Sequence, residues 1–142
     1  MAKFVYEYPK EIIEDFRQIY NDYGRIVGAM TRAGAEVVYK NVQNNVPASI
    51  KNSEMMQCLR LTKTYKTPTD NALNTKVAFY GYFTNHNGVK TPAPLVANVY
   101  EYGRSNAPFP KQPFFRKAFN TKQIEKAILE AQKRESGGLL DE

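Results

Sequence analysis

The first third of the chain carries apolar side chains at helical spacing. Before Gly24 they follow one another at steps of four, three and four residues, at Ile12, Phe16, Ile19 and Tyr23. Beyond it, nearly the same face continues through Ile26, Met30, Ala33, Val37 and Val42. Residues 10–45 are therefore predicted to be helical, as one long helix or as two hinged near Gly24, since glycine costs a helix interior only about 1 kcal/mol. Pro47 ends the segment, because the residue before a proline avoids helical backbone.

Two later segments alternate their side chains with the period of a β-strand. In residues 58–66, the alternation puts on one face Leu59, Leu61, Lys63 and Tyr65. In residues 75–84, one face holds Val77, Phe79 and Phe83, and the other holds Ala78, Tyr80 and Tyr82. Aromatic rings on both faces predict a second strand that is covered on both sides. Turn residues between the segments, at Pro68, Asp70 and Asn71, predict that the two strands form the core hairpin of a small, mainly antiparallel sheet.

The remaining segments connect or cover this hairpin. Residues 48–57 are predicted to be a polar loop, residues 85–88 a tight turn, and residues 94–102 either helix or strand. Residues 103–113 are predicted to be an irregular loop, punctuated by Gly103, Pro108, Pro110 and Pro113. A helix is predicted to follow Pro113, with an apolar side made of Phe115, Ala118, Phe119, Ile128 and Ala131.

These elements predict an α+β fold in a single domain. The long N-terminal helix, or helix pair, and the C-terminal helix are expected to pack on the small sheet. Strands and helices do not alternate regularly, which argues against a Rossmann-like fold. The domain is expected to span residues 1–134. The run Ser136–Gly137–Gly138 predicts a flexible tail over residues 135–142.

The composition is that of a globular protein with a basic surface. The 142 residues are 42% hydrophobic and 24% charged, and the formal net charge is +6. The basic residues are scattered, so specific nucleic acid binding is not expected. A basic nucleic-acid-binding module is nevertheless the alternative function, because ten tyrosines accompany the positive charge. No apolar stretch approaches the roughly 20 residues that span a bilayer. With a single cysteine and no apolar signal core in residues 1–10, the chain is expected to be cytosolic when it is made.

No residue pattern predicts a catalytic, cofactor or metal site. A structural zinc ion needs about four Cys or His ligands, whereas the chain holds only Cys58, which is expected to be buried or half-buried, and His86. Three acids are expected to form a solvated face of the first helix: Glu11, Glu14 and Asp15. Two glycines are expected to allow close helix packing: Gly28 and Gly34. A small enzyme, such as a nuclease or toxin, would return as a hypothesis if a change at Glu101, His86 or Arg116 abolished an activity.

Glu101 is the acid with the most unusual surroundings in the sequence. It lies between Tyr100 and Tyr102, in an aromatic segment where a carboxylate must stay solvated or find a partner. Arg104 and Arg116 are the candidate partners. The pair is either a structural ion pair within the subunit or a contact between subunits.

The loop that follows Glu101 has the features of a docking surface. Gly103 can adopt positive φ and turn the chain sharply. The prolines stiffen the loop and lower the entropy cost of ordering it at an interface. Phe109 lies between two of them and is predicted to be held outward. The alternative is a loop that merely covers the sheet.

Three stretches of the chain, taken in order, carry a family resemblance. They are Val46–Pro47 with Leu59–Arg60–Leu61–Thr62, then Val99–Tyr100–Glu101–Tyr102–Gly103, then Gln112–Pro113–Phe114–Phe115–Arg116–Lys117–Ala118–Phe119. Over roughly residues 25–130, the chain resembles the tail-completion, tail-terminator and head–tail joining (neck) proteins of long-tailed phages, typified by a minor tail protein of the lambdoid coliphage Hong Kong 97. Two positions depart from the family pattern, since Cys58 stands in place of a glycine and Lys117 in place of a proline.

The resemblance implies an α+β structural subunit of the virion, without catalysis or cofactor, that completes or terminates the tail or joins it to the head. Its implied partners are further copies of itself in a ring, expected to be hexameric, the major tail tube protein and the head–tail connector proteins. The implied location is the virion, at the head–tail junction or the tail end, and the host cytoplasm during assembly, with no membrane as a partner. The candidate interface comprises Glu101, Tyr102, Gly103, Arg104, Phe109 and Arg116.

Overall fold

The computed structural model describes residues 10–104 and 109–137, so residues 1–9, 105–108 and 138–142 lie outside the description. In chain order the elements are α1 (Lys10–Asn45), α2 (Ala48–Lys51), η1 (Glu54–Cys58), β1 (Leu59–Leu61), β2 (Tyr65–Lys66), β3 (Leu73–Asn74), β4 (Val77–Phe79), β5 (Tyr82–Thr84), β6 (Lys90–Pro92), α3 (Ala93–Tyr102), η2 (Arg116–Ala118) and α4 (Thr121–Ser136). The predicted α+β class is confirmed. Within the described residues, no helix is long and apolar enough to cross a membrane.

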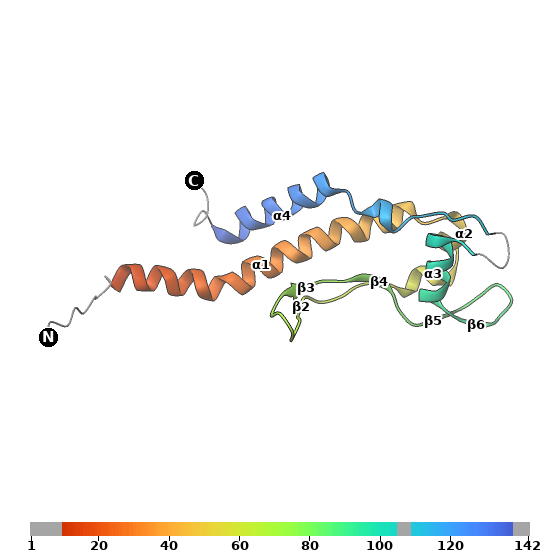
Figure 1. Ribbon diagram of the computed structural model, residues 1–142, viewed down its shortest axis with the longest axis horizontal. Coiled ribbons are helices and arrows are strands. Elements are labelled where there is room, and N and C mark those ends of the chain that lie inside the picture. The colour runs from red at the N-terminus through yellow and green to blue at the C-terminus, as the bar shows by residue number, and fades with distance from the viewer. Residues whose placement is uncertain (1–9, 105–108, 138–142) are drawn as a thin grey trace.

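α1 is the axis of an elongated molecule (Figure 1). It runs without a break through Gly24, so residues 10–45 form one helix and not two. It ends two residues before Pro47, as the sequence predicts. The three acids near its start are exposed, as expected. The side chains of Ile12, Phe16 and Ile19, which were predicted to lie on its apolar face, fall outside the described residues.

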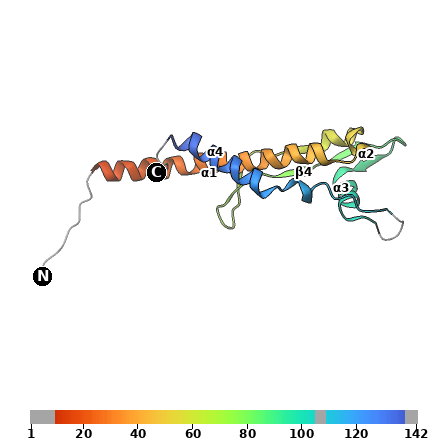
Figure 2. The same ribbon diagram turned by 90° about the horizontal axis from the view of Figure 1, so that it is seen from above.

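α4 lies antiparallel along one side of α1 (Figures 1 and 2). Gly34 allows the close approach of the two helices, because a Cβ there would lie 3.4 Å from Ile124 Cγ2. Near the end of α4, Arg25 Nη1 lies 2.5 Å from Glu135 Oε2. The two helices are thus held together by apolar packing in the middle and by an ion pair at one end.

The beginning and end of α4 differ from the predictions. The helix was expected directly after Pro113, whereas α4 begins at Thr121. The side chain of Asn120 caps it by accepting a hydrogen bond from the Gln123 N–H, a stronger start signal than the proline. Glu135 and Ser136, assigned to a tail by the sequence, form its last turn.

Residues 59–79 form an antiparallel hairpin on the other side of α1 (Figure 1). β1 pairs with β4, with Leu59 opposite Phe79, and β2 pairs with β3 nearer the turn. At the tip, the Thr67 N–H donates to the Ala72 carbonyl at 2.9 Å. This confirms the predicted core hairpin.

A β-bulge in this hairpin alters the predicted alternation of its first strand. Leu61 lies opposite Val77, but Tyr65 lies opposite Asn74, so the first strand holds one residue more than the second between these pairs. Thr64, within this stretch, lies beside α1, since a Cβ at Gly28 would be 3.9 Å from its Cγ2 atom. Tyr65, predicted on the same face as the leucines, is exposed instead.

The predicted strand over residues 75–84 is divided in two. Gly81 adopts φ +81°, a backbone conformation that glycine tolerates, and the chain then leaves the hairpin. β5 pairs with β6 through the predicted turn, in which the Gly88 N–H donates to the Asn85 carbonyl. Tyr80 and Tyr82 are both exposed. The expectation of a strand covered on both sides was therefore wrong for the single subunit.

The segment predicted to be a polar loop, residues 48–57, contains the short helices α2 and η1. Two of its apolar residues, Ile50 and Met55, are almost completely buried. Ser53 caps η1 by accepting a hydrogen bond from the Met55 N–H at 3.2 Å. Residues 94–102, ambiguous in the sequence, belong to the helix α3.

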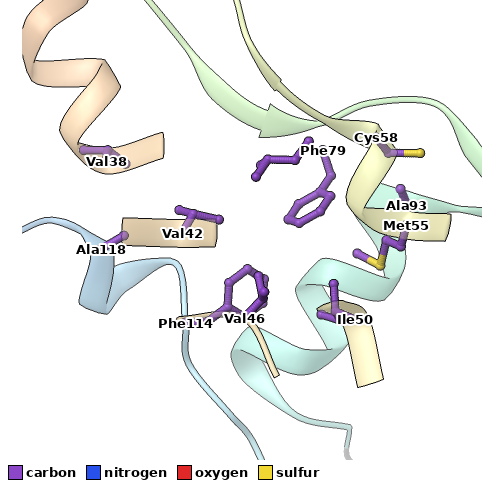
Figure 3. Packing of buried hydrophobic residues seen from close by; sticks show 11 residues of the cluster. Val38, Val42, Val46, Ile50, Met55, Cys58, Phe79, Ala93, Phe114 and Ala118 are labelled. Atoms are coloured by element: carbon purple, nitrogen blue, oxygen red, sulfur yellow. The ribbon is translucent and has the colours of Figure 1, made fainter. Parts of the chain in front are cut away.

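The hydrophobic core lies where the C-terminal half of α1, the hairpin and the short helices meet (Figure 3). Its buried side chains are Val38, Val42, Val46, Ile50, Met55, Cys58, Leu59, Phe79, Ala93, Phe114 and Ala118. The Phe79 and Phe114 rings meet edge to face, with centroids 6.1 Å apart. Phe114 thereby anchors the segment after the candidate loop to the sheet.

Candidate functional site

Glu101, in the last turn of α3, directs its carboxylate into the protein and is only 5% exposed. Its Oε2 accepts hydrogen bonds from the N–H groups of Phe114 and Phe115, both at 2.9 Å. Its Oε1 accepts one from the N–H of Arg116 at 3.1 Å. The carboxylate thus satisfies three consecutive backbone donors where the chain enters η2, and helix starts need such external acceptors. We call this arrangement the Glu101 lock.

The Arg116 side chain closes the lock from the solvent side. Its Nε lies 2.9 Å from Glu101 Oε1, and its Nη2 donates to the Glu101 carbonyl at 3.3 Å. The guanidinium carbon lies 5.3 Å from the centroid of the Tyr102 ring, in cation–π geometry. The arginine side chain is 56% exposed. The predicted ion pair of Glu101 therefore forms within one subunit, with Arg116 and not Arg104.

These contacts determine the ionisation of Glu101. Burial raises its pKa, but the N–H groups of Phe115, Arg116 and Phe114, together with the Arg116 side chain, lower the pKa below its ordinary value of 4.5. Each carboxylate oxygen already accepts two hydrogen bonds. Glu101 is therefore charged at neutral pH and is poorly placed to take up a proton as a general base.

Gly103 turns the chain away from α3 as the sequence predicts. It adopts φ +81°, and its N–H donates to the Val99 carbonyl at 2.8 Å. A Cβ at Gly103 would lie 3.1 Å from the Phe109 carbonyl oxygen, so the returning strand of the loop leaves little room for one. Gln112 then donates its N–H to the Tyr100 carbonyl at 2.7 Å, which ties the end of the loop to α3.

Phe109 corrects the expectation of a ring held outward. It is half-buried, and its ring meets Tyr100 edge to face, with centroids 5.1 Å apart. Its carbonyl accepts a long hydrogen bond, 3.4 Å, from the Arg104 N–H. Phe109 thus packs on α3 as well as bordering the surface. Pro108, one of the two prolines invoked for the outward position, lies outside the described residues.

A cavity of about 250 Å³ opens beside the lock. Phe79 and Phe114 line its inner part, and Tyr102 and Arg116 line it from the side of the lock. Tyr102 is 65% exposed. β4 contributes Ala78 as well as Phe79, and its only hydrogen-bonded neighbour among the described strands is β1, so one edge of β4 is unpaired. The site therefore combines aromatic side chains with backbone groups that another chain could pair.

A larger cavity, of about 590 Å³, lies at the other side of α3, against α2, η1 and the β5–β6 hairpin. His86 and Glu54 line it, but the described residues hold no group of three side chains that could bind a metal ion. Cys58 is buried, within its predicted range, and its Sγ lies 3.6 Å from the Tyr82 carbonyl oxygen.

The structure brings most of the candidate interface together and adds residues that sequence reasoning missed. Glu101, Tyr102 and Arg116 meet at the lock, Gly103 starts the loop, and Arg104 and Phe109 close it. The missed participants are the N–H groups of residues 114 and 115, for which no sequence signal exists because every residue other than proline carries such a donor. Comparisons of the chain with family models, with curated proteins and with solved structures find no match.

Proposed function

We propose that the protein is a structural virion subunit that completes or terminates a phage tail, or joins the tail to the head, through contacts with other proteins in a ring. The Glu101 lock is the observation that carries this proposal. Glu101 belongs to one stretch of the phage-family resemblance and Phe114–Arg116 to another, and hydrogen bonds tie these stretches into one unit. A loop fixed on a rigid scaffold is typical of a binding surface.

The surface around the lock has the composition of a protein interface. Interfaces are enriched in aromatic residues and arginine and depleted in lysine and acids. Tyr102 and Arg116 stack on each other at the surface. Leu95, which lies on α3 like Tyr102, is a large apolar residue with an exposed side chain. The unpaired edge of β4 offers backbone hydrogen bonds nearby. This combination supports binding of another protein over turnover of a small molecule.

A ring follows if this surface contacts a different surface on the next copy. Heterologous contacts of this kind close into rings when the rotation between neighbours is a fraction of a full turn. The family resemblance favours six copies. We expect the isolated subunit to be monomeric or weakly associated, with the ring forming on a tail tube.

Light scattering of the purified protein, alone and after mixing with tail tubes of the same phage, tests the proposal. The mass of the free protein should be that of a monomer or a weak oligomer, and a ring should bind to the tubes. Tyr102→Ala should weaken tube binding, whereas Tyr23→Ala, at an equally exposed tyrosine on α1, should not. A tight two-fold dimer that tubes leave unchanged would contradict the ring.

A further inference from the structure

The hairpin presents a second surface, on the face turned away from α1. Hydrogen bonds join Tyr80 N–H to the Cys58 carbonyl and Thr62 N–H to the Lys76 carbonyl, both at 2.9 Å. Since strand side chains alternate, Arg60, Lys76 and Tyr80 project from the face opposite to the buried Leu59 and Phe79. We call the exposed side chains of Arg60, Tyr65, Lys76 and Tyr80 the outer face.

Tyrosine rings and basic groups are interleaved on this surface. Lys76 Nζ lies 5.6 Å from the centroid of the Tyr65 ring. A hydrogen bond with Tyr65, together with the electrostatic influence of Tyr65 and Tyr80, raises the pKa of Lys76 above its ordinary value. The neighbouring β5–β6 hairpin repeats the pairing, with Lys90 Nζ 5.2 Å from the centroid of the Tyr82 ring. Tyr82 is nevertheless 62% exposed.

Acidic groups are almost absent from this part of the chain. Between residues 58 and 92 the basic residues are Arg60, Lys63, Lys66, Lys76 and Lys90, and the acidic residue is Asp70, at the hairpin tip. Among the described residues, every ion pair involves helical arginines, such as Arg25 with Glu135, and none involves the hairpins. The outer face therefore carries positive charge that the described part of the protein does not neutralise.

We propose that the outer face and the Tyr82–Lys90 pair bind single-stranded nucleic acid without sequence preference. Lys76, Lys90 and Arg60 would neutralise phosphates, and bases would stack on Tyr80 and Tyr82. Stacking on exposed aromatic side chains beside a basic groove is how proteins hold single strands. An acidic protein would use the charges but has no need of the rings, and a duplex keeps its bases stacked internally. The single strand fits both features.

The test is fluorescence anisotropy with a labelled oligothymidine of about 15 nucleotides, within the usual site size, titrated at several salt concentrations. Three neutralised phosphates predict that log K falls with log salt at a slope of about −2, since each phosphate on a single strand contributes about −0.7. Lys76→Gln should reduce the slope by about 0.7. Tyr80→Ala and Tyr82→Ala should each weaken binding by about 5- to 150-fold, the equivalent of about 1–3 kcal/mol per stacked base.

Two matched variants serve as controls and should bind like the wild type: Tyr23→Ala on α1 and Lys126→Gln on α4, both at exposed positions. Thermal melting checks that each variant folds, and if Tyr80→Ala fails to fold, Tyr82→Ala carries the test. The proposal is overturned if the oligonucleotide does not bind at low salt, or if the control variants weaken binding as much. It is also overturned if a polyglutamate or a random duplex binds as tightly as the single strand and the tyrosine variants have no effect. These outcomes do not depend on ring formation.

Discussion

Replacing Glu101 with alanine removes the acceptor of four hydrogen bonds, whereas replacing Arg116 with alanine removes one side-chain donor from the same carboxylate. If the lock works chiefly by satisfying backbone donors, the two substitutions must differ widely in effect. If it works as a salt bridge, they must be similar. The comparison therefore separates two accounts of one site.

The magnitudes follow from burial. Glu101→Ala leaves three N–H groups, on residues 114–116, without their acceptor, and an unpaired buried donor costs about 1–3 kcal/mol. Water can reach the donor nearest the surface, so we expect a loss of about 3–5 kcal/mol, a large fraction of the roughly 5–15 kcal/mol that stabilises a domain. Arg116→Ala leaves the carboxylate with its three backbone donors. Because the Arg116 side chain is more than half exposed, its loss should cost about 1 kcal/mol or less.

Urea denaturation of the wild type and both variants measures these differences, provided that the slope with denaturant is unchanged. Glu101→Gln adds a pH dependence. The folded-state pKa of Glu101 is lowered, so the charged group stabilises the fold fully above its ordinary value of 4.5, and the contribution is lost as the pH falls through the lower folded-state pKa. The gap in unfolding free energy between wild type and Glu101→Gln should therefore be constant near neutrality and shrink below about pH 4.5. Equal losses for Glu101→Ala and Arg116→Ala would refute this account of the lock.

Further substitutions test the packing and the loop. Phe114→Ala should lower the free energy of unfolding by about 3–5 kcal/mol in urea denaturation, because the ring is 1% exposed. Phe115→Ala should lower it clearly less, because that ring is half-buried. The reverse order would contradict the role of Phe114 as the anchor. In thermal melting, Gly24→Ala should stabilise α1 by about 0.5–1 kcal/mol, since nothing lies within 4 Å of the added Cβ. Gly34→Leu should instead cost about 1–3 kcal/mol by overpacking against α4, and stability equal to wild type would contradict that contact. Phe109→Ala should lose about 0.5–1.5 kcal/mol from its aromatic pair in addition to the burial of a half-exposed ring, less in total than Phe114→Ala, yet fail to complement infectious particles. Full complementation would move the interface elsewhere, first to α1.

The parts of the fold that followed from the sequence were those that local chemistry determines. The helix over residues 10–45 repeats its apolar positions regularly and stops before Pro47, so its bounds were predictable. The hairpin was predictable from alternation and turn residues. By contrast, Ile50 and Met55 lie in a mostly polar segment without helical or strand periodicity, and only tertiary packing determines that α2 and η1 bury them. The break at Gly81 lies within an alternating pattern, and a glycine there permits a bend without specifying that the chain changes sheet.

The candidate site was predictable in part for the same reason. A carboxylate in an aromatic segment needs a partner, and Arg116 was one of two choices within reach along the chain. The backbone donors that dominate the lock depend on how the loop returns to α3, which spacing does not reveal. Phe109 shows the same limit, because flanking prolines restrict its backbone but do not determine that its ring contacts Tyr100.

The measurement that most directly tests the proposed role is electron microscopy of intact phage particles carrying the protein with a gold-labelled tag appended after residue 142. We expect label at one place in each particle, either at the head–tail junction or at the end of the tail, because a ring-forming completion or joining subunit occupies a single level of the virion. Label spread along the tail or over the capsid, or purified infectious particles without the protein, would contradict the account.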